Sequence, residues 1–225
     1  MTARAEWLTI VGDPARWRSI GLTVTDEGLI PLMGTSLRLL TPASGELDGA
    51  AAERSEGSAA SGSSPDGIVG WALSDAPGAP PESVDGLATE YVASADPVFA
   101  AHDLGASGLD HVVVLTADLQ RTSEAIAVAT GCELKRIREV GEMRQGFHRI
   151  GRGGLIVELV ERPDVPEGPA TFWGLVLNVD DLDAACALLG PDRVSAPKDA
   201  VQPGRRIATL RASVGLGLPV ALMTP

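Results

Sequence analysis

The stretch from residue 109 to residue 131, LDHVVVLTADLQRTSEAIAVATG, decides the fold class. HVVVLT (111–116) is rich in β-branched residues and predicts a strand. Asp118 is a predicted N-cap for a helix over residues 119–130, and Gly131 is typical of the position that follows a helix. Three further strands are predicted after this helix, in CELKRIREV (132–140), RQGFHRIG (144–151) and LIVELVE (155–161). The stretch and its continuation therefore form a βαβββ unit.

A second unit of the same kind follows from residue 171. FWGLVLNV (172–179) predicts a strand, and DDLDAACALLG (180–190) predicts a short capped helix that ends at Gly190. The remaining strands of this unit are predicted in RVSAPKDAVQPG (193–204), which also contains a turn, RRIATLRAS (205–213) and LPVALMT (218–224). The two units share one order of elements, so the sequence predicts an internal repeat.

A fainter copy of the pattern precedes them. WLTIV (7–11) predicts a strand, Asp13 a helix N-cap, and ARWRSIG (15–21) a short helix that ends at a glycine. Further elements are predicted as strands in GLIPLM (28–33), TSLRLLT (35–41) and GIVGWALS (67–74), and as a helix in ESVDGLATEYV (82–92). The chain therefore divides into a degenerate half at residues 1–104 and a better-formed domain at residues 105–225, and the fold class is α+β with paired βαβββ modules.

Residues 42–66, PASGELDGAAAERSEGSAASGSSPD, form a predicted flexible loop within the first half. The loop is rich in Ser, Gly and Ala and has almost no large apolar side chains. Such a segment buries too little surface to offset the entropy lost on ordering.

The charge of the chain excludes several classes of partner. There are 18 basic and 30 acidic residues, so the formal net charge is −12. A field of this sign repels phosphate backbones and anionic lipids, so neither nucleic acid nor a membrane is an expected partner. No targeting segment or membrane span is visible, which predicts a cytoplasmic protein. The two cysteines, Cys132 and Cys186, are expected to be small buried hydrophobes rather than nucleophiles.

Four segments together resemble one known superfamily. They are GLDHVVVLTADLQRTSEAI (108–126), GFHRIG (146–151), GLIVELVE (154–161) and FWGLVLNVDDLDAA (172–185). This combination resembles the glyoxalase, or vicinal oxygen chelate, superfamily, and in particular its uncharacterised glyoxalase-like proteins. The resemblance implies sheets that curl into half-open barrels, with a cavity for a small molecule on the concave face. It also implies a homodimer, because relatives often pair modules across subunits.

The same resemblance implies a metal site. In the superfamily, each of two modules supplies one ligand from its first strand and one from its last strand. Carried over to this chain, these positions are His111 and Glu158 in the first C-terminal module, and Gly174 and Ala221 in the second. Glycine and alanine have no donor atom, so the implied divalent metal has two of four ligands. A catalytic metal generally keeps three or more protein ligands, so the site is incomplete.

The N-terminal copy adds no ligand set of its own. When Asp13 is aligned with Asp118, the matching positions are Glu6 and Arg38. An arginine at a ligand position would repel a cation.

His111 and Glu158 also permit interpretations without metal. Both lie in strands that are otherwise apolar, and a carboxylate buried there must be paired or hydrogen-bonded. The pair is a candidate catalytic acid and base in the cavity. The alternative is a His–Glu hydrogen bond that is retained only as structure.

Other candidate ligand-binding residues follow from strand alternation. In RQGFHRIG, one face carries Gln145, Phe147 and Arg149, and the other carries Arg144, His148 and Ile150; the sequence leaves open which face lines the cavity. Two more candidates are Trp173, which lies beside Gly174 and could cap a flat ligand, and Arg206, which suits an anionic ligand but also a charged edge strand. His102 is expected to face solvent.

Three functions from different classes follow, the last of which, beside the two described next, is a structural or assembly partner whose pocket is vestigial. The first is an enzyme, a glyoxalase-like lyase, isomerase or dioxygenase, acting on a small oxygen-rich molecule with Glu158 and His111 as catalytic groups. The second is a non-catalytic protein that binds or sequesters a small molecule, which the missing ligands at Gly174 and Ala221 favour.

Overall fold

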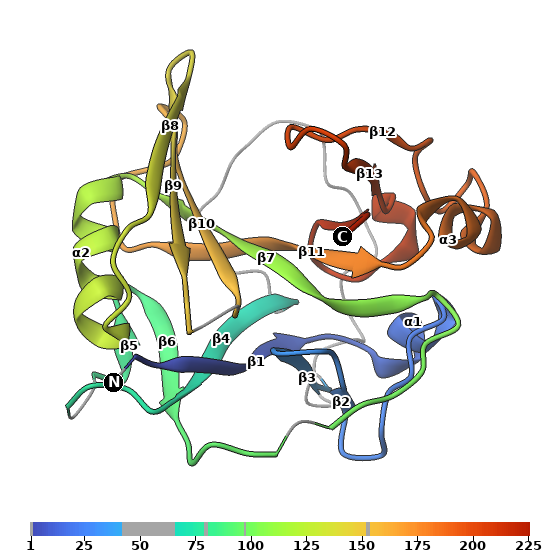
Figure 1. The fold of residues 1–225 in the computed structure, drawn as a ribbon, viewed down its shortest axis with the longest axis horizontal. Coiled ribbons are helices and arrows are strands. Elements are labelled where there is room, and N and C mark those ends of the chain that lie inside the picture. The colour runs from blue at the N-terminus through green and yellow to red at the C-terminus, as the bar shows by residue number, and fades with distance from the viewer. Residues whose placement is uncertain (1, 42–65, 79–80, 97, 152–153) are drawn as a thin grey trace, which may run out of the picture.

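The structure is a computed structural model, and it describes residues 2–41, 66–78, 81–96, 98–151 and 154–225. The predicted loop at 42–66 lies outside the described residues except for Asp66. Figure 1 shows two curled sheets, one above the other, with the helices at their ends. Within the described residues, no helix is long and apolar enough to cross a membrane.

The upper sheet contains both C-terminal units, and its order is β12-β13-β14-β11-β7-β10-β9-β8. The two long strands β7 (Ala106–Thr116) and β11 (Thr171–Val179) run antiparallel at its centre. Each is flanked by a parallel strand of its own unit, β10 (Ile156–Glu161) or β14 (Val220–Met223). The outer strands are β8 (Arg136–Val140), β9 (Met143–Arg149), β12 (Lys198–Asp199) and β13 (Arg206–Thr209).

Capping residues fix both helices of this half where the sequence predicts them. In α2 (Leu119–Thr130), the Asp118 side chain accepts a hydrogen bond from the Arg121 N–H, and Gly131 adopts the left-handed conformation at φ 67°. In α3 (Leu182–Leu189), the Asp181 side chain accepts from the Ala184 N–H. A short 3₁₀ helix, η1 (Ala212–Val214), precedes β14.

The lower sheet repeats this pattern of pairings with fewer strands. Its order is β2-β3-β1-β4-β6-β5, with β1 and β4 antiparallel at the centre and a parallel neighbour on each side. Its strands are β1 (Arg4–Val11), β2 (Leu29–Ile30), β3 (Ser36–Leu40), β4 (Gly67–Ser74), β5 (Ser83–Val84) and β6 (Leu87–Tyr91). Its helix among the described residues is α1 (Pro14–Ser19), capped by Asp13.

The helix predicted over residues 82–92 is wrong, because this segment is the β5–β6 hairpin. Its turn is Asp85-Gly86, and both residues have positive φ, 48° and 94°. An Asp-Gly pair with this backbone favours a two-residue hairpin turn. The alternation of buried Val84, Leu87 and Thr89 with exposed neighbours is that of a strand, so the turn signal overrides the weak helical spacing.

Two predicted strands are much shorter than expected. Residues 193–204 contribute only Lys198–Asp199, and residues 28–33 contribute only Leu29–Ile30. Prolines at positions 31, 197 and 203 lack the N–H that a longer ladder needs.

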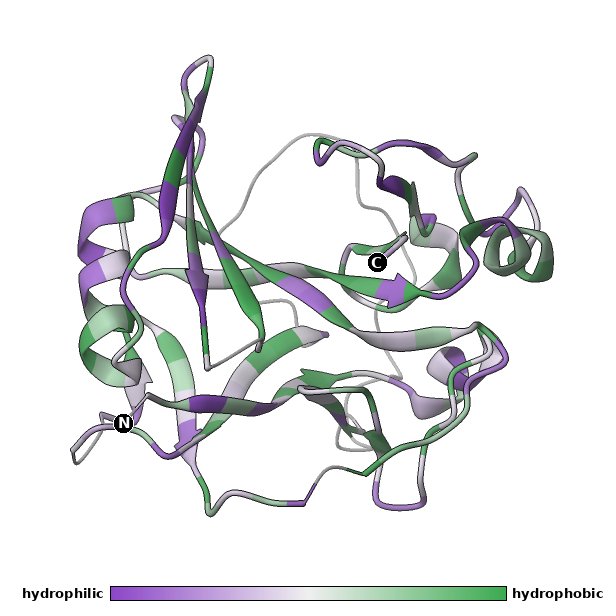
Figure 2. Ribbon diagram, viewed as in Figure 1, coloured by the Kyte–Doolittle hydropathy of each residue, from purple (hydrophilic) through white to green (hydrophobic). Residues whose placement is uncertain are grey.

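One hydrophobic core lies between the two sheets. It contains side chains from both, among them Leu8 and Ile10 of β1 and Val112 and Val114 of β7, all fully buried. Figure 2 shows hydrophobic residues along β4 and β10 and hydrophilic residues along the projecting β8–β9 hairpin. The core joins strands from residues 4–91 to strands from residues 106–223, so the division into two domains stays a prediction.

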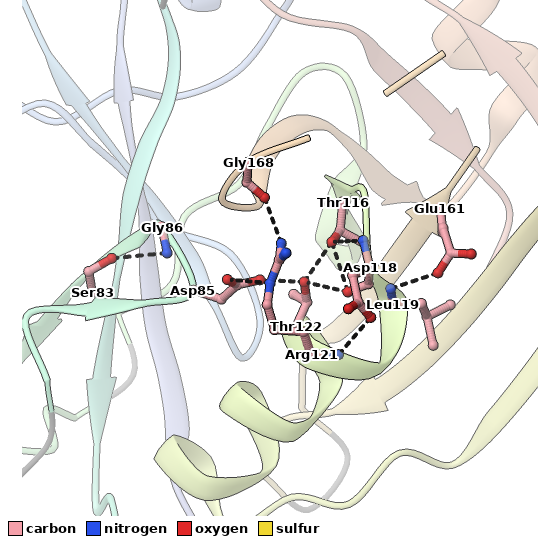
Figure 3. A network of polar contacts seen from close by, with 10 residues as sticks. All are labelled: Ser83, Asp85, Gly86, Thr116, Asp118, Leu119, Arg121, Thr122, Glu161 and Gly168. Carbon is pink, nitrogen blue, oxygen red and sulfur yellow. Dashed lines mark hydrogen bonds and ion pairs between the residues drawn. The ribbon is translucent and has the colours of Figure 1, made fainter. Parts of the chain in front are cut away.

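A polar network joins the two sheets at one end of this core (Figure 3). The Asp85 carboxylate, in the β5–β6 turn, accepts hydrogen bonds from Arg121 Nε at 2.9 Å and Thr122 Oγ1 at 2.5 Å, both on α2. Arg121 also donates to the Gly168 carbonyl at 2.6 Å. Because the Asp85 side chain is only 12% exposed, the ion pair between Asp85 and Arg121 in this network is partly buried.

We predict that Asp85→Asn lowers the free energy of unfolding by about 2 kcal/mol, because it removes the negative charge that is paired with the partly buried Arg121 guanidinium. Asn tolerates positive φ, so the turn itself is kept. Urea denaturation measures the effect. The matched control is Asp75→Asn, because Asp75 also has positive φ, 53°, but is exposed. Equal losses in both variants would contradict the network's role.

Candidate functional site

A cavity of about 220 Å³ opens on the face of the upper sheet that is turned away from the core. Val112, Val114 and Val157 point into the core, so His111 and Glu158, which alternate with them, point to the opposite face. The cavity is lined by Asp110, His111, Lys135, Arg136, Phe147, His148, Arg149, Ile156, Glu158 and Gln202.

The structure brings His111 and Glu158 together at the floor of this cavity. Strand β10 runs parallel to β7, with Ile156 opposite His111, so Glu158 lies one alternation step further along. His111 Nε2 is 3.4 Å from Glu158 Oε2, and the two side chains are 14% and 13% exposed. The expected pairing of these residues is therefore present in the structure.

Asp110 joins this pair and was missed by the sequence analysis. Regular alternation would place it on the face opposite to His111. In the pairing of β7 with β11, however, Leu177 lies opposite Leu109 and Val176 opposite His111, so Asp110 is the extra residue of a β-bulge. The bulge turns its carboxylate to the cavity side, where Oδ1 is 2.7 Å from His111 Nδ1.

Arg205 binds the second carboxylate oxygen of Asp110, Oδ2. Its Nη2 donates to Asp110 Oδ2 at 2.7 Å and to Asn178 Oδ1 at 2.8 Å, while its Nε donates to the Thr224 carbonyl at 2.7 Å. The chain Arg205–Asp110–His111–Glu158 therefore runs across the sheet from the residue that precedes β13 to β10. The arginine side chain is only 18% exposed, which strengthens its charged hydrogen bonds.

Burial and charge move the two carboxyl groups in opposite directions. Burial alone would raise the pKa of Asp110, but hydrogen bonds and charge from His111 and Arg205 outweigh it and hold the pKa at about 2. Burial raises the pKa of Glu158, and the opposing effects of His111 and the Gln145 hydrogen bond do not cancel the rise. A carboxyl group that stays protonated to higher pH is suited to proton transfer.

The face of β9 that the sequence left open is now assigned. Gln145, Phe147 and Arg149 share the side of Glu158: Phe147 and Arg149 line the cavity, and Gln145 Nε2 donates to Glu158 Oε1 at 2.5 Å. The Arg136 guanidinium lies 4.9 Å from the centre of the Phe147 ring. The cavity therefore has an aromatic wall and a basic rim.

His148 contributes to the same wall, but its ring lies on the α2 side of the sheet. Its nitrogens contact Ser123 Oγ at 3.0 Å and the Cys132 carbonyl at 2.9 Å. Burial lowers the pKa of this histidine, which favours the neutral ring. His148 therefore does not join His111.

Comparisons with known proteins place the fold. The chain resembles a variant of 4-hydroxymandelate synthase from Streptomyces coelicolor over 100% of its own length and 93% of that chain, with a TM-score of 0.63 and 16% identity. The chain has the fold of the vicinal oxygen chelate superfamily. Methylmalonyl-CoA epimerase from Mycobacterium tuberculosis matches 54% of this chain and 89% of its own at TM-score 0.45 and 21% identity. No family profile and no curated protein matches the chain.

The residues of this vicinal oxygen chelate fold do not fit a resident divalent metal. His111 and Glu158 supply one donor each, and the Asp110 oxygens are engaged by His111 and Arg205. Among the described residues, no group of three or more His, Cys, Asp or Glu side chains is placed to hold an ion. Two ligands hold a divalent metal weakly.

In the second unit, the positions that match the ligands are Gly174 and Ala221, which have no donor atom, and Ala221 belongs to an apolar cluster. Ala221 packs with Val176 and Met223, against Ala200 and Ile207. A Cβ at Gly174 would lie 2.7 Å from the Pro219 carbonyl, so this glycine leaves room for the neighbouring backbone and not for a ligand. The second half of the hollow face is therefore filled by side chains.

Two predicted ligand-binding residues lie outside the cavity, and a third residue is more buried than expected. Trp173 is 44% exposed at a bulge between Phe172 and Gly174. Arg206 binds Asp183 of α3 at 2.7 Å, while its neighbour Arg205 enters the site. The expectation that His102 faces solvent is wrong: it is 8% exposed, with hydrogen bonds to the Thr23 N–H and the Pro31 carbonyl.

We predict that Asp110→Asn destabilises the protein by about 2 kcal/mol at pH 7, since a pKa of about 2 lies well below the ordinary value for Asp. A lowered carboxyl pKa contributes stability above the unfolded-state pKa, and this is lost as the pH falls from about 4 to about 2. Urea denaturation at several pH values measures both effects. Asp183→Asn, which removes an exposed carboxylate, should still lose stability as the pH falls from about 4 to about 2. If this loss is absent in Asp183→Asn, the assignment to Asp110 is contradicted.

Proposed function

We propose that the protein is an enzyme that moves a proton on a small, oxygen-rich, anionic molecule bound over His111 and Glu158. The observation that carries this proposal is the 3.4 Å contact between His111 Nε2 and Glu158 Oε2 within a cavity. Such chemistry belongs to the isomerase and lyase classes expected from the sequence. The donor set gives no support to the metal-dependent alternatives, dioxygenase included, because it supplies two ligands.

Asp110 determines which ring nitrogen of His111 faces Glu158. Its carboxylate accepts the Nδ1–H of the ring, so Nε2 faces Glu158. Nε2 and Oε2 lie 3.4 Å apart, so a shared proton can lie on either partner. With the proton on His111, the Glu158 carboxylate is the base that removes a substrate proton. The imidazolium N–H then stabilises the negative charge that develops on a substrate oxygen.

Gln145 limits the freedom of the base. Its amide donates to Glu158 Oε1, so the other oxygen, Oε2, is the one that faces His111. A carboxylate held by one donor keeps a free lone pair for proton abstraction. The geometry therefore supports Oε2 as the atom that accepts the proton.

The rim of the cavity supports an anionic substrate. Lys135, Arg136 and Arg149 surround its opening, although the net charge of the chain is −12. Arginine and lysine placed in this way attract and orient a carboxylate or phosphate. Phe147 offers an apolar surface for the carbon skeleton between the rim and the floor.

One observation favours a second candidate, a protein that binds the same small molecule without turnover. The apolar cluster of Val176, Ala221 and Met223 occupies the half of the hollow face that supplies ligands in metal-dependent relatives. A binding protein needs the basic rim and the aromatic wall but not the shared proton.

We predict that the protein catalyses exchange of carbon-bound hydrogen for deuterium next to a carbonyl group. Incubation with pyruvate, 2-oxobutyrate or acetoacetate in D₂O, followed by ¹H NMR, measures the rate. Glu158→Gln should lower the rate at least about 100-fold, because the base is lost. Burial raises the pKa of Glu158, so the rate should rise with pH through a midpoint above the ordinary range for Glu.

The matched control for this experiment is Glu142→Gln, an exposed carboxylate at the tip of the β8–β9 hairpin. It should leave the exchange rate unchanged. A thermal shift with these acids but no exchange would select the binding protein. Exchange that survives Glu158→Gln in a folded variant would overturn the assignment of the base.

We also predict that EDTA treatment and dialysis leave the exchange rate unchanged, because two side chains do not retain a metal through the reaction. Metal analysis of protein purified without chelator provides the second readout. A stoichiometric metal that is lost together with activity, and is also lost in His111→Ala, would contradict the metal-independent account.

A further inference from the structure

A second cavity, of about 300 Å³, opens on the lower sheet. Leu8, Ile10 and Leu37 point into the shared core, so Trp7 and Arg38, which alternate with residues of that core, point to the other face. This face is the one opposite to the core that the lower sheet shares with the upper sheet, and Figure 1 shows the two sheets one above the other. The lining of this cavity includes Trp7, Leu29, Leu32, Arg38 and Val98.

Strand β1, under this cavity, contains a β-bulge, as strand β7 does under the first cavity. In the pairing of β1 with β4, Leu73 lies opposite Ala5 and Ala72 opposite Trp7, so Glu6 is the extra residue of a β-bulge. Its carboxylate is turned to the cavity side and accepts a hydrogen bond from Ser74 Oγ at 2.5 Å. Bulges that redirect a side chain are frequent next to binding sites, and Asp110 provides the parallel case in the same chain.

The wall of the cavity combines an aromatic ring with a weakly held cation. The Arg38 guanidinium lies 5.6 Å from the centre of the Trp7 ring. Its ion pair with Glu90 is 3.8 Å long, and the two side chains are 45% and 55% exposed. An exposed pair at this distance contributes little, so the guanidinium can exchange Glu90 for a ligand carboxylate at small cost.

The rest of the wall near Trp7 is mainly apolar, with Leu29, Leu32 and Val98. Glu6 accepts a hydrogen bond from Ser74 and lies 3.9 Å from Arg4. Glu27 and Asp96 are exposed at the rim, where solvent screens their charges. We propose that this cavity is a binding site for a small aromatic monocarboxylate, with its ring against Trp7 and the leucines and its carboxylate on Arg38.

The probe for this site is naphthalene-2-carboxylate, measured by isothermal titration calorimetry and by quenching of tryptophan fluorescence. We expect saturable binding with one site in this cavity, and about tenfold weaker binding of the uncharged naphthalene-2-carboxamide. In Arg38→Gln, which changes an exposed side chain, the preference for the acid over the amide should disappear. In Trp7→Phe, the quenching should be lost while calorimetry still reports binding.

The first cavity is also lined by an arginine, Arg149, and an aromatic ring, Phe147, so the Arg149 variant is the matched control. Arg149→Gln should leave the Arg38-dependent binding unchanged. Binding that is lost in Arg149→Gln but not in Arg38→Gln would assign the probe to the first cavity and overturn the proposal. Absence of saturable binding, or an equal affinity for acid and amide in the wild type, would overturn it as well. None of these outcomes depends on whether Glu158 acts as a base.

Discussion

The site depends on one backbone irregularity, the β-bulge at Asp110 in the central strand β7. Without the extra residue, alternation would send the Asp110 carboxylate to the core face, where an unpaired charge is costly. With it, Asp110 and His111 point to the same side, and the 2.7 Å contact between them directs the other ring nitrogen to Glu158. Arg205 compensates the buried carboxylate from the second unit, so the bulge also ties the two units together.

Most of the C-terminal half was predictable because its signals are local. Asp118 and Asp181 cap their helices, Gly131 ends one of them, and β-branched runs form the central strands. The N-terminal half was less predictable. In residues 82–92, helical spacing competed with an Asp-Gly turn, and the turn decided the structure because both its residues adopt positive φ. The lengths of the strands beside prolines were overestimated. A proline lacks the N–H of the ladder, but how far this shortens a strand depends on the neighbouring strand.

The site was predictable only in part. Two residues far apart in the chain, His111 and Glu158, follow from strand parity and from the resemblance, and the structure places them in contact. Asp110 was missed because a bulge reverses parity and leaves no clear sequence signal. Arg206 was the predicted ligand-binding residue, whereas Arg205, one residue before β13, pairs with Asp110 and Arg206 pairs with Asp183.

The most direct test of the account is the protonation of His111, measured by ¹H–¹⁵N NMR of the imidazole ring. The chain has three histidines, so comparison with His111→Gln assigns the signals. We expect Nδ1 to carry the proton of the neutral ring, because Asp110 accepts a hydrogen bond from it. A neutral ring protonated on Nε2 instead would contradict the arrangement on which the proposed chemistry rests.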